Sequence, residues 1–286
     1  MWEHPDALVL VAAGNTGENG PGTVGTPATN KNGVSVGATL NSAGSWESFG
    51  MSAGTDYYSE ESLAYFSSRG PTKDGRMKPD VTGVGMWTEV GVWMCRRRLS
   101  LFHTPSECIN VCVVTGWYIT GAQHKYPVQA GEHCSVSANL GTSFSSPLLA
   151  GHAALAREYF VSGYYPSGMR NPADGFEPSG ALLKAVLIHG AEKLKQVQLG
   201  SGGVESTNIE RGDNNQGYGR SQLNNVLSFG VNATLEGLTF FVVGAAGKNV
   251  GPYAEMKASD SPHEYTFTTT STSDPKPIRI TLAYTV

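Results

Sequence analysis

Ser143 stands where a serine hydroxyl could act as a nucleophile. It follows Gly141 and Thr142, which allow a tight turn, and it precedes a run rich in alanine and glycine. Apolar residues at a spacing of three and four predict a buried helix over residues 143–160, with Pro147 tolerated in its first turn. The N-terminus of a helix presents unpaired N–H groups and a partial positive charge, which would stabilise an oxyanion beside the serine. The alternative is that Ser143 only caps the helix.

Asn15 is the second candidate residue. Residues 7–13 form an unbroken apolar run that ends in Gly14 and Asn15. Such a run predicts a parallel strand that is buried on both faces. Because functional groups in α/β sheets gather at the carboxyl ends of the strands, Asn15 lies where a site would form. Asparagine is also a common turn residue, which is the alternative interpretation.

A third segment, residues 66–81, carries turn signals and several charges. Its Gly-Pro and Asp-Gly pairs predict a loop, and its charged side chains indicate exposure to solvent. The pattern places none of its residues to do chemistry, so we expect the segment to be scaffold.

These three segments resemble the subtilisin-like serine proteases. The serine signature of that family matches every constrained position from Gly141 to Gly151, and residues 66–81 match a family block almost without a break. The resemblance implies that Ser143 forms an acyl-enzyme with a peptide or protein substrate. It also implies that Asn15 is the side-chain donor of the oxyanion hole. A neutral amide suits that role because it donates a hydrogen bond without titrating.

The remaining pattern completes the expected fold. A second helix is predicted from Ser179, its cap, to about Leu194. From about residue 235 apolar residues alternate with threonines, which is typical of half-buried antiparallel strands. Together with the resemblance, this predicts an α/β fold with a parallel sheet flanked by helices, its N-terminal part missing, followed by a truncated antiparallel β-sandwich.

The same reasoning predicts two domains. Residues 1–230 are expected to be the C-terminal portion of a subtilisin-like catalytic domain, and residues 231–286 a partial β-sandwich. Residues 86–120 interrupt the family pattern with three of the five tryptophans, three of the four cysteines and a run of three arginines. Three interpretations stay open for this stretch: a surface insertion, translated non-coding sequence, and a zinc site.

The zinc interpretation would use Cys95, His103, Cys108 and Cys112. Structural zinc sites usually combine two pairs of closely spaced ligands, and only Cys108 with Cys112 approximates one such pair. We therefore predict no metal and no cofactor from the residues themselves.

The resemblance also implies an aspartate and a histidine that complete a catalytic triad with the serine. In the family both come before the strand that carries the asparagine. His4 and Asp6 precede that strand here, but they lie in a loop without the family's surrounding motif. The other histidines that we considered follow the strand, namely His103, His124, His133 and His152.

Two further arrangements would use residues within the chain. His152 lies on the same expected helix as Ser143, about 13 Å further along its axis, and cannot reach Ser143 Oγ. A non-standard triad of Asp80, His124 and Ser143 is the alternative arrangement within the chain. Because no aspartate or histidine stands in the motif that the family resemblance implies, we expect a serine endopeptidase whose triad is incomplete, so that these 286 residues alone are inactive.

The alternative function is a non-catalytic binding or structural protein on a subtilisin-like scaffold. A binding scaffold needs neither Asn15 nor Ser143, so their joint presence favours the protease. Composition excludes two other classes of protein: a net charge of −4 and a hydrophobic content of 40% indicate neither disorder nor a nucleic-acid partner. No apolar run approaches the roughly 20 residues that span a bilayer, so no membrane contact is expected.

The remaining expectations rest on the family resemblance. It allows structural calcium, although residues 213–215, Asp-Asn-Asn, are better interpreted as a turn because the other ligand positions of a calcium loop are missing. It implies a secreted or extracellular protein, in which Asn232 of Asn-Ala-Thr would be a glycosylation acceptor. Residues 1–6 themselves contain no signal peptide.

Overall fold

The structure is a computed structural model that describes residues 3–42, 59–86, 88–90, 113–115, 118–120, 137–200, 203–206, 212–230 and 278–284. The strands are β1 (Leu10–Ala12), β2 (Val34–Thr39), β3 (Ser62–Leu63), β4 (Val81–Val84), β5 (Thr88–Val90), β6 (Val113–Thr115), β7 (Tyr118–Thr120), β8 (Ser137–Asn139), β9 (Gln196–Gln198) and β10 (Val204–Ser206). The helices are α2 (Thr142–Val161) and α3 (Gly180–His189), with short 3-10 turns η1 (Gly17–Asn19), η2 (Pro172–Asp174) and η3 (Leu223–Asn225).

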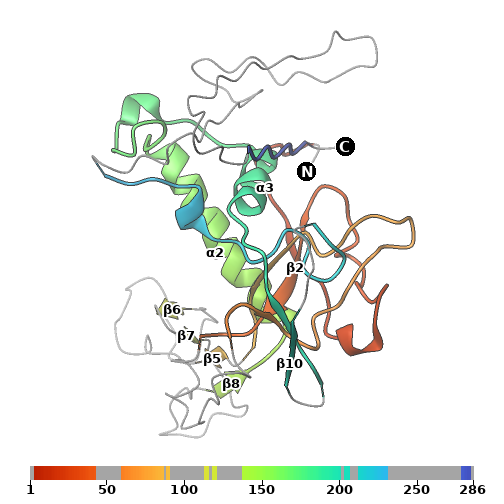
Figure 1. The fold of residues 1–286 in the computed structure, drawn as a ribbon. Helices are drawn as coiled ribbons and strands as arrows, with labels where there is room; N and C mark the ends of the chain where they lie inside the picture. The colour runs from red at the N-terminus through yellow and green to blue at the C-terminus, as the bar shows by residue number, and fades with distance from the viewer. Residues whose placement is uncertain are drawn as a thin grey trace, which may run out of the picture.

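Six strands form one mixed sheet around β2 (Figure 1). β1 and β4 pair in parallel with β2, with Leu10 opposite Val34 and Val36 opposite Val81. β3 pairs antiparallel with the end of β2 at Thr39, and β9 and β10 continue the sheet from there. The α/β class is therefore confirmed, but the sheet is mixed and not purely parallel as predicted.

The predicted first strand is shorter and less buried than its apolar sequence indicates. β1 comprises only Leu10–Ala12, and all three residues are half-buried. Leu8 and Leu10 pack on a buried cluster of the sheet and its helices, whereas Val9 is 48% exposed. The prediction of burial on both faces is wrong because, in the described part of the chain, only one face of this strand is well covered.

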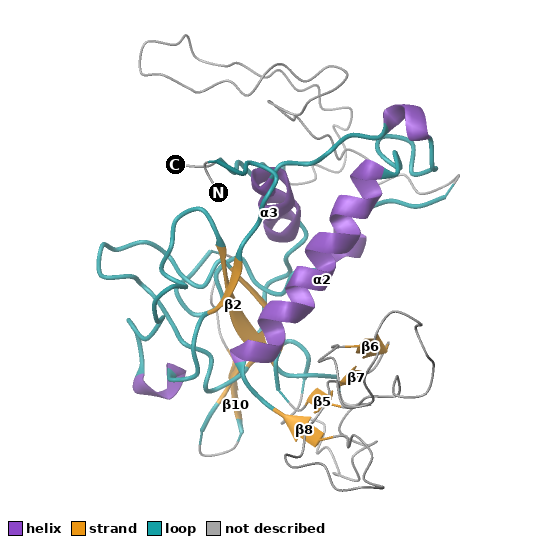
Figure 2. Cartoon of the chain, turned by 180° about the vertical axis from the view of Figure 1, so that it is seen from behind, coloured by secondary structure: helices purple, strands orange, loops and turns teal. Residues whose placement is uncertain are grey.

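Both helices pack against the sheet and against each other (Figure 2). α2 contacts β1, β2 and β4. Leu149 of α2 and Ile188 of α3 meet Val34, Val36 and Val81 in one buried cluster. This apolar packing fixes the direction of α2 relative to the parallel strands.

The predicted helix boundaries are nearly correct. α2 spans Thr142–Val161, against the predicted 143–160. Ser179 caps α3 as predicted, since its side chain accepts a hydrogen bond from Leu182 N at 3.1 Å.

The end of α3 is the exception. The helix stops at His189 and not near Leu194. Two residues beyond Gly190, Glu192 pairs with Arg220 through two backbone hydrogen bonds of 2.8 Å. This tertiary pairing pulls the backbone into an extended path, which local helix propensity could not foretell.

The second face of β2 is covered by residues 66–82. At Gly37 an added Cβ would lie 2.8 Å from Ser67 Oγ and 3.1 Å from both Pro79 and Thr82 side-chain carbons. Ser67 Oγ also accepts a hydrogen bond from Ala38 N at 3.0 Å. The segment is therefore packed scaffold, and the expected general exposure of its charges is wrong for Lys78 and Asp80, which are 2% and 8% exposed.

Asp80 is the centre of a buried ionic cluster at the start of β4. Its carboxylate lies 2.6 Å from Lys78 Nζ and accepts a hydrogen bond from Ser35 N at 2.7 Å. Lys184 of α3 approaches it to 3.9 Å and also donates to two carbonyls of the loop before β2. Burial lowers the pKa of Lys184, and the Asp80 charge opposes that shift. The cluster ties β2, β4 and α3 together at one end of the sheet.

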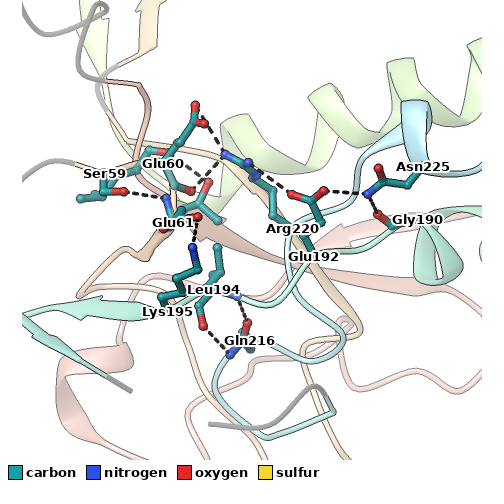
Figure 3. Close-up of polar contacts among 12 residues, drawn as sticks. Ser59, Glu60, Glu61, Gly190, Glu192, Leu194, Lys195, Gln216, Arg220 and Asn225 are labelled. Atoms are coloured by element: carbon teal, nitrogen blue, oxygen red, sulfur yellow. Dashed lines mark hydrogen bonds and ion pairs between the residues drawn. The ribbon is translucent and has the colours of Figure 1, made fainter. Parts of the chain in front are cut away.

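Arg220 forms a second polar junction, at the antiparallel side of the sheet (Figure 3). Its guanidinium donates to Glu60 O at 3.1 Å and lies 3.8 Å from the Glu192 carboxylate. Lys195 and Glu61 form a neighbouring pair at 2.6 Å. These contacts hold the segments that lead into β3 and β9 against residues 216–222.

The C-terminal β-sandwich is not confirmed, since residues 231–277 lie outside the described residues. Residues 278–284 belong to no strand. Arg279 and Thr281 contact His189 at the end of α3, while the alternating apolar residues Ile278 and Leu282 are 64% and 80% exposed. The predicted half-burial of this apolar face is therefore wrong for these residues, because α3 contacts their polar neighbours.

Residues 86–120 are described only in part. Met86 is buried among Ala38, Leu40, Ala64 and Phe66. β5 pairs with β8 and β6 pairs with β7, each as a two-stranded antiparallel sheet. The proposed zinc ligands lie outside the described residues, so the choice among the three interpretations stays open. No described helix has both the length and the apolar character needed to cross a membrane.

The ionic cluster gives a stability prediction. Asp80→Asn should lower the free energy of unfolding by about 3 to 5 kcal/mol, because it leaves the buried Lys78 ammonium without an anion. The matched control is Asp74→Asn, since the Asp74–Arg76 pair is exposed and should change stability little. Urea denaturation at constant m value measures both; equal losses for the two variants would contradict the prediction.

Candidate active site

Ser143 is the second residue of α2, and its side chain is exposed. The turn into the helix depends on Gly141, whose φ of 145° favours glycine. Gly141 N donates a 2.7 Å hydrogen bond to Gly85 O, just beyond the end of β4. Ser143 therefore lies at the carboxyl end of the parallel strands, the end where sites form in α/β sheets.

Asn15 is held against this helix start by Thr142. The Asn15 Oδ1 atom accepts two hydrogen bonds of 2.9 Å, one from Thr142 N and one from Thr142 Oγ1. The Thr142 hydroxyl in turn accepts from Gly14 N at 3.1 Å. Because Thr142 holds Oδ1 as an acceptor, the orientation of the Asn15 amide group is fixed. Its donor atom, Nδ2, is on the side of the amide that does not face the two Thr142 donors.

The donor end of Asn15 borders the glycine turn. A Cβ added at Gly141 would lie 3.3 Å from Asn15 Nδ2. Glycine at this position therefore serves two purposes, since it adopts the positive φ and leaves room for the amide. The structure places Asn15 directly against the residues that precede Ser143.

The contact between β4 and α2 is close. A Cβ added at Gly85 would lie 2.1 Å from Ser145 Oγ and 2.8 Å from Gly141 O. Only a glycine allows the first turn of α2 to approach the strand end this closely. Gly85 thus sets the depth at which the helix start sits on the sheet.

Pro147 differs from its predicted place. It is the sixth residue of α2 and so lies beyond the first turn. Because proline has no N–H, the helix lacks the hydrogen bond that Ser143 O would otherwise accept. Counted from the predicted start at residue 143, Pro147 would already be the fifth residue, so its placement in the first turn is wrong for either boundary.

His4 and Asp6 do not lie beside the serine. Both are exposed, and the Asp6 carbonyl accepts a hydrogen bond from the Arg157 guanidinium. Arg157 lies about 21 Å beyond Ser143 along the axis of α2. The segment before β1 is thus anchored near the far end of that helix.

The remaining acid and base candidates are also separated from Ser143, or lie outside the described residues. Asp80 is engaged with two lysines at the start of β4, whereas the serine turn meets the opposite end of that strand. His152 lies on α2 itself, about 13 Å along the axis from Ser143. His103, His124 and His133 lie outside the described residues.

His152 is a half-buried histidine on α2. Burial lowers its pKa below the usual value of 6.5, and its Nδ1 atom has no hydrogen-bond partner in the described part of the chain. Its distance along the helix from Ser143, and not its pKa, removes it as a general base for the serine.

The turn at residues 213–217 matches the sequence interpretation. Asp213 Oδ1 accepts hydrogen bonds from Asn215 N and Gln216 N at 2.7 and 2.8 Å, which is the pattern of a capped turn. The structure thus shows a turn here, and structural calcium stays an expectation of the family resemblance.

Three residues that shape the site were not singled out as functional from the sequence. They are Thr142, which holds Asn15, Gly85, which admits the helix start, and Ser68, which contacts the Asn15 loop. Thr142 and Ser68 stand inside recognisable motifs, so a signal was present. Their partners lie far away in the sequence, and only the fold reveals them.

The fold is an α/β architecture in which a serine stands at a helix start and an asparagine follows the adjoining strand. The chain belongs to the subtilase family, whose sequence model matches residues 1–219. The resemblance inferred from the serine segment and residues 66–81 is therefore confirmed.

The chain is similar to proteins of Dictyostelium discoideum. It is 30% identical to "Serine protease/ABC transporter B family protein tagD" over 144 residues, which are 50% of this chain and 7% of that protein. It is 29% identical to "Serine protease/ABC transporter B family protein tagB" over 209 residues, which are 68% of this chain and 9% of that protein. The chain thus spans less than a tenth of either relative.

Solved proteases give weaker matches. The chain matches the prenylagaramide maturation protease PagA at 15% identity and a TM-score of 0.37, covering 76% of this chain and 48% of that one. It matches the S41 psychrophilic protease at 19% identity and a TM-score of 0.38, with 76% and 48% covered.

The close approach at Gly85 gives a second prediction. Gly85→Ala should lower the free energy of unfolding by about 1 to 3 kcal/mol, because the new methyl group overlaps Ser145 Oγ. Gly151→Ala is the matched control: no atom lies within 4 Å of the added Cβ, and in a helix interior alanine should gain about 0.5 to 1 kcal/mol. The melting temperature and the urea midpoint should fall for Gly85→Ala and rise for Gly151→Ala. An unchanged free energy of unfolding for Gly85→Ala would contradict the packing argument.

His152 gives a pH prediction. Its pKa is lower in the folded than in the unfolded chain, so between the two values the unfolded chain binds more protons. Stability from this residue is therefore present above about pH 6.5 and falls as the pH drops toward the folded pKa. His152→Leu should lose less stability than the native chain between those pH values. Urea titrations at several pH values test this; parallel profiles for the two proteins would refute it.

Proposed function

We propose that this chain is the serine-bearing part of a subtilisin-like endopeptidase. Ser143 is the nucleophile, and Asn15 Nδ2 together with an amide of the first turn of α2 forms the oxyanion hole. The observation that supports the proposal is the pair of hydrogen bonds from Thr142 to Asn15 Oδ1, which engage the acceptor end of the amide while its Nδ2 donor borders the Gly141 turn before Ser143. An oxyanion hole requires such preorganised donors, because they stabilise charge without moving during the reaction.

In the proposed reaction Ser143 Oγ attacks the carbonyl carbon of the scissile peptide, and its proton passes to a histidine base. The carbonyl oxygen becomes negatively charged and is stabilised by Asn15 and the helix start. The intermediate then expels the amine, which takes the proton from the histidine and leaves an acyl-enzyme. Water repeats the sequence and releases the acid, restoring the Ser143 hydroxyl.

We propose that the histidine and its orienting aspartate are contributed by sequence outside these 286 residues. The support is spatial: Asp6 is anchored near Arg157, Asp80 is paired with lysines, and His152 lies about 13 Å along the helix. We call the longer polypeptide that carries both residues the complete enzyme.

A non-catalytic binding or structural protein is the alternative. It would keep the packed sheet, the ionic cluster around Asp80 and the Arg220 junction, since these stabilise the fold. It would have no need of an oriented Asn15 amide beside an exposed serine. That arrangement therefore favours the protease.

Other expectations rest on the family resemblance alone. They are a peptide or protein substrate, a secreted or extracellular location, and structural calcium elsewhere in the molecule. We keep them as predictions.

The activity prediction separates the two functions. The 286-residue chain alone should not hydrolyse casein at an enzymatic rate, because among the described residues no histidine lies beside Ser143 to take its proton. In subtilisin, removal of triad residues leaves about 10³ to 10⁴ of acceleration over water, a known value that sets the background to expect. The complete enzyme should hydrolyse casein and react with a fluorophosphonate probe.

Ser143→Ala should abolish both signals in the complete enzyme. Ser146→Ala is the matched control, because this half-buried serine lies one turn along the same helix. Robust turnover by the short chain would refute the missing-base argument. Inactivity of the complete enzyme would favour the binding protein.

A further inference from the structure

Ser68 stands beneath the loop that carries Asn15. It is fully buried and comes from the segment between β3 and β4, far from Asn15 in the sequence. Its backbone N–H donates to Gly14 O at 3.0 Å. Its Oγ accepts from Thr16 N at 3.2 Å and lies 3.3 Å from Thr16 Oγ1. Both neighbours of Asn15 are therefore bonded to this one serine.

Packing reinforces these hydrogen bonds. Gly14 has a φ of 115°, and a Cβ there would lie 2.8 Å from Ser68 Oγ and 3.4 Å from Ser68 Cβ. The backbone before Asn15 thus rests directly on the serine side chain. A glycine is needed at this point both for the positive φ and for the close approach.

We infer that Ser68 is a positioning residue for Asn15, acting through the backbone of residues 14–16. Thr142 orients the Asn15 side chain from the helix, while Ser68 fixes the backbone from the opposite side. Neither contact is sufficient alone. Without the Ser68 contacts, the backbone of residues 14–16 could shift and displace the amide that Thr142 orients. Without the Thr142 contacts, the Asn15 amide could rotate although its backbone is fixed. The two together hold the donor within the narrow limits that oxyanion stabilisation requires.

Ser67 provides an internal comparison. It is also fully buried and also uses its Oγ to accept a backbone N–H, but the donor is Ala38 of β2. The two adjacent serines therefore have matched burial and matched hydrogen-bond chemistry. Only Ser68 is bonded to the Asn15 loop.

The inference rests on the proposed function and predicts how catalysis fails when Ser68 is changed. A displaced oxyanion donor weakens binding of the transition state and not of the substrate. In the complete enzyme Ser68→Ala should lower kcat by about 10- to 100-fold while leaving KM within about twofold. Ser67→Ala should lose similar thermal stability but keep kcat.

A double-mutant cycle tests whether Ser68 acts through Asn15. In an Asn15→Ala background the donor is already absent, so Ser68→Ala should cause no further loss of kcat. Independent, multiplying losses would overturn the inference. An equal kcat for the Ser68→Ala and Ser67→Ala enzymes would also overturn it.

A second variant covers failure of Ser68→Ala to fold. Thr16 is exposed, so Thr16→Ala should fold while losing the Oγ1 contact to Ser68. It should lower kcat by a smaller factor at unchanged KM, and Thr16→Ser, which keeps the hydroxyl, should restore it. A native kcat for Thr16→Ala would overturn the inference. Absence of Ser143-dependent turnover in the unmutated enzyme would instead overturn the proposed function and this inference together.

Discussion

The hydrogen bonds between Thr142 and Asn15 join the two elements on which the candidate site depends. One element is the start of α2, which carries Ser143, and the other is the loop after β1, which carries Asn15. Neither element could place the other by local structure, since 127 positions of sequence separate Asn15 from Thr142. The junction also needs two glycines, Gly141 for the turn and Gly85 for the approach to β4, because any side chain at either position meets a neighbour.

The rest of the fold keeps these two elements in register. Apolar side chains of α2 and α3 pack on one face of β2, and residues 66–82 cover the other face. The Asp80 cluster closes the sheet at the end opposite the serine, so its charges are remote from the proposed chemistry. Keeping a buried ionic cluster at one end and an exposed serine at the other lets the first stabilise the scaffold without perturbing the second.

Residues 66–82 show how scaffold and site are connected. Lys78 and Asp80 bind the segment to β2 and α3, Ser67 bonds the middle of β2, and Ser68 contacts the Asn15 loop. A segment that contributes no reacting group thereby determines the position of one. Its near-complete agreement with a family block is understandable physically, because each of these contacts requires a particular residue size or polarity.

The sequence by itself determined the family, the serine at a helix start, the cap at Ser179 and the strand end at Asn15, because these follow from local pattern and motif. Tertiary structure decided the mixed sheet, the half-buried state of β1 and the early end of α3, where pairing of Glu192 with Arg220 overrides helix propensity. It alone revealed that Lys78 and Asp80 are buried and that Thr142 and Ser68 hold Asn15. Their hydrogen-bond partners are distant in the chain, and local sequence carries no information about which distant groups will meet.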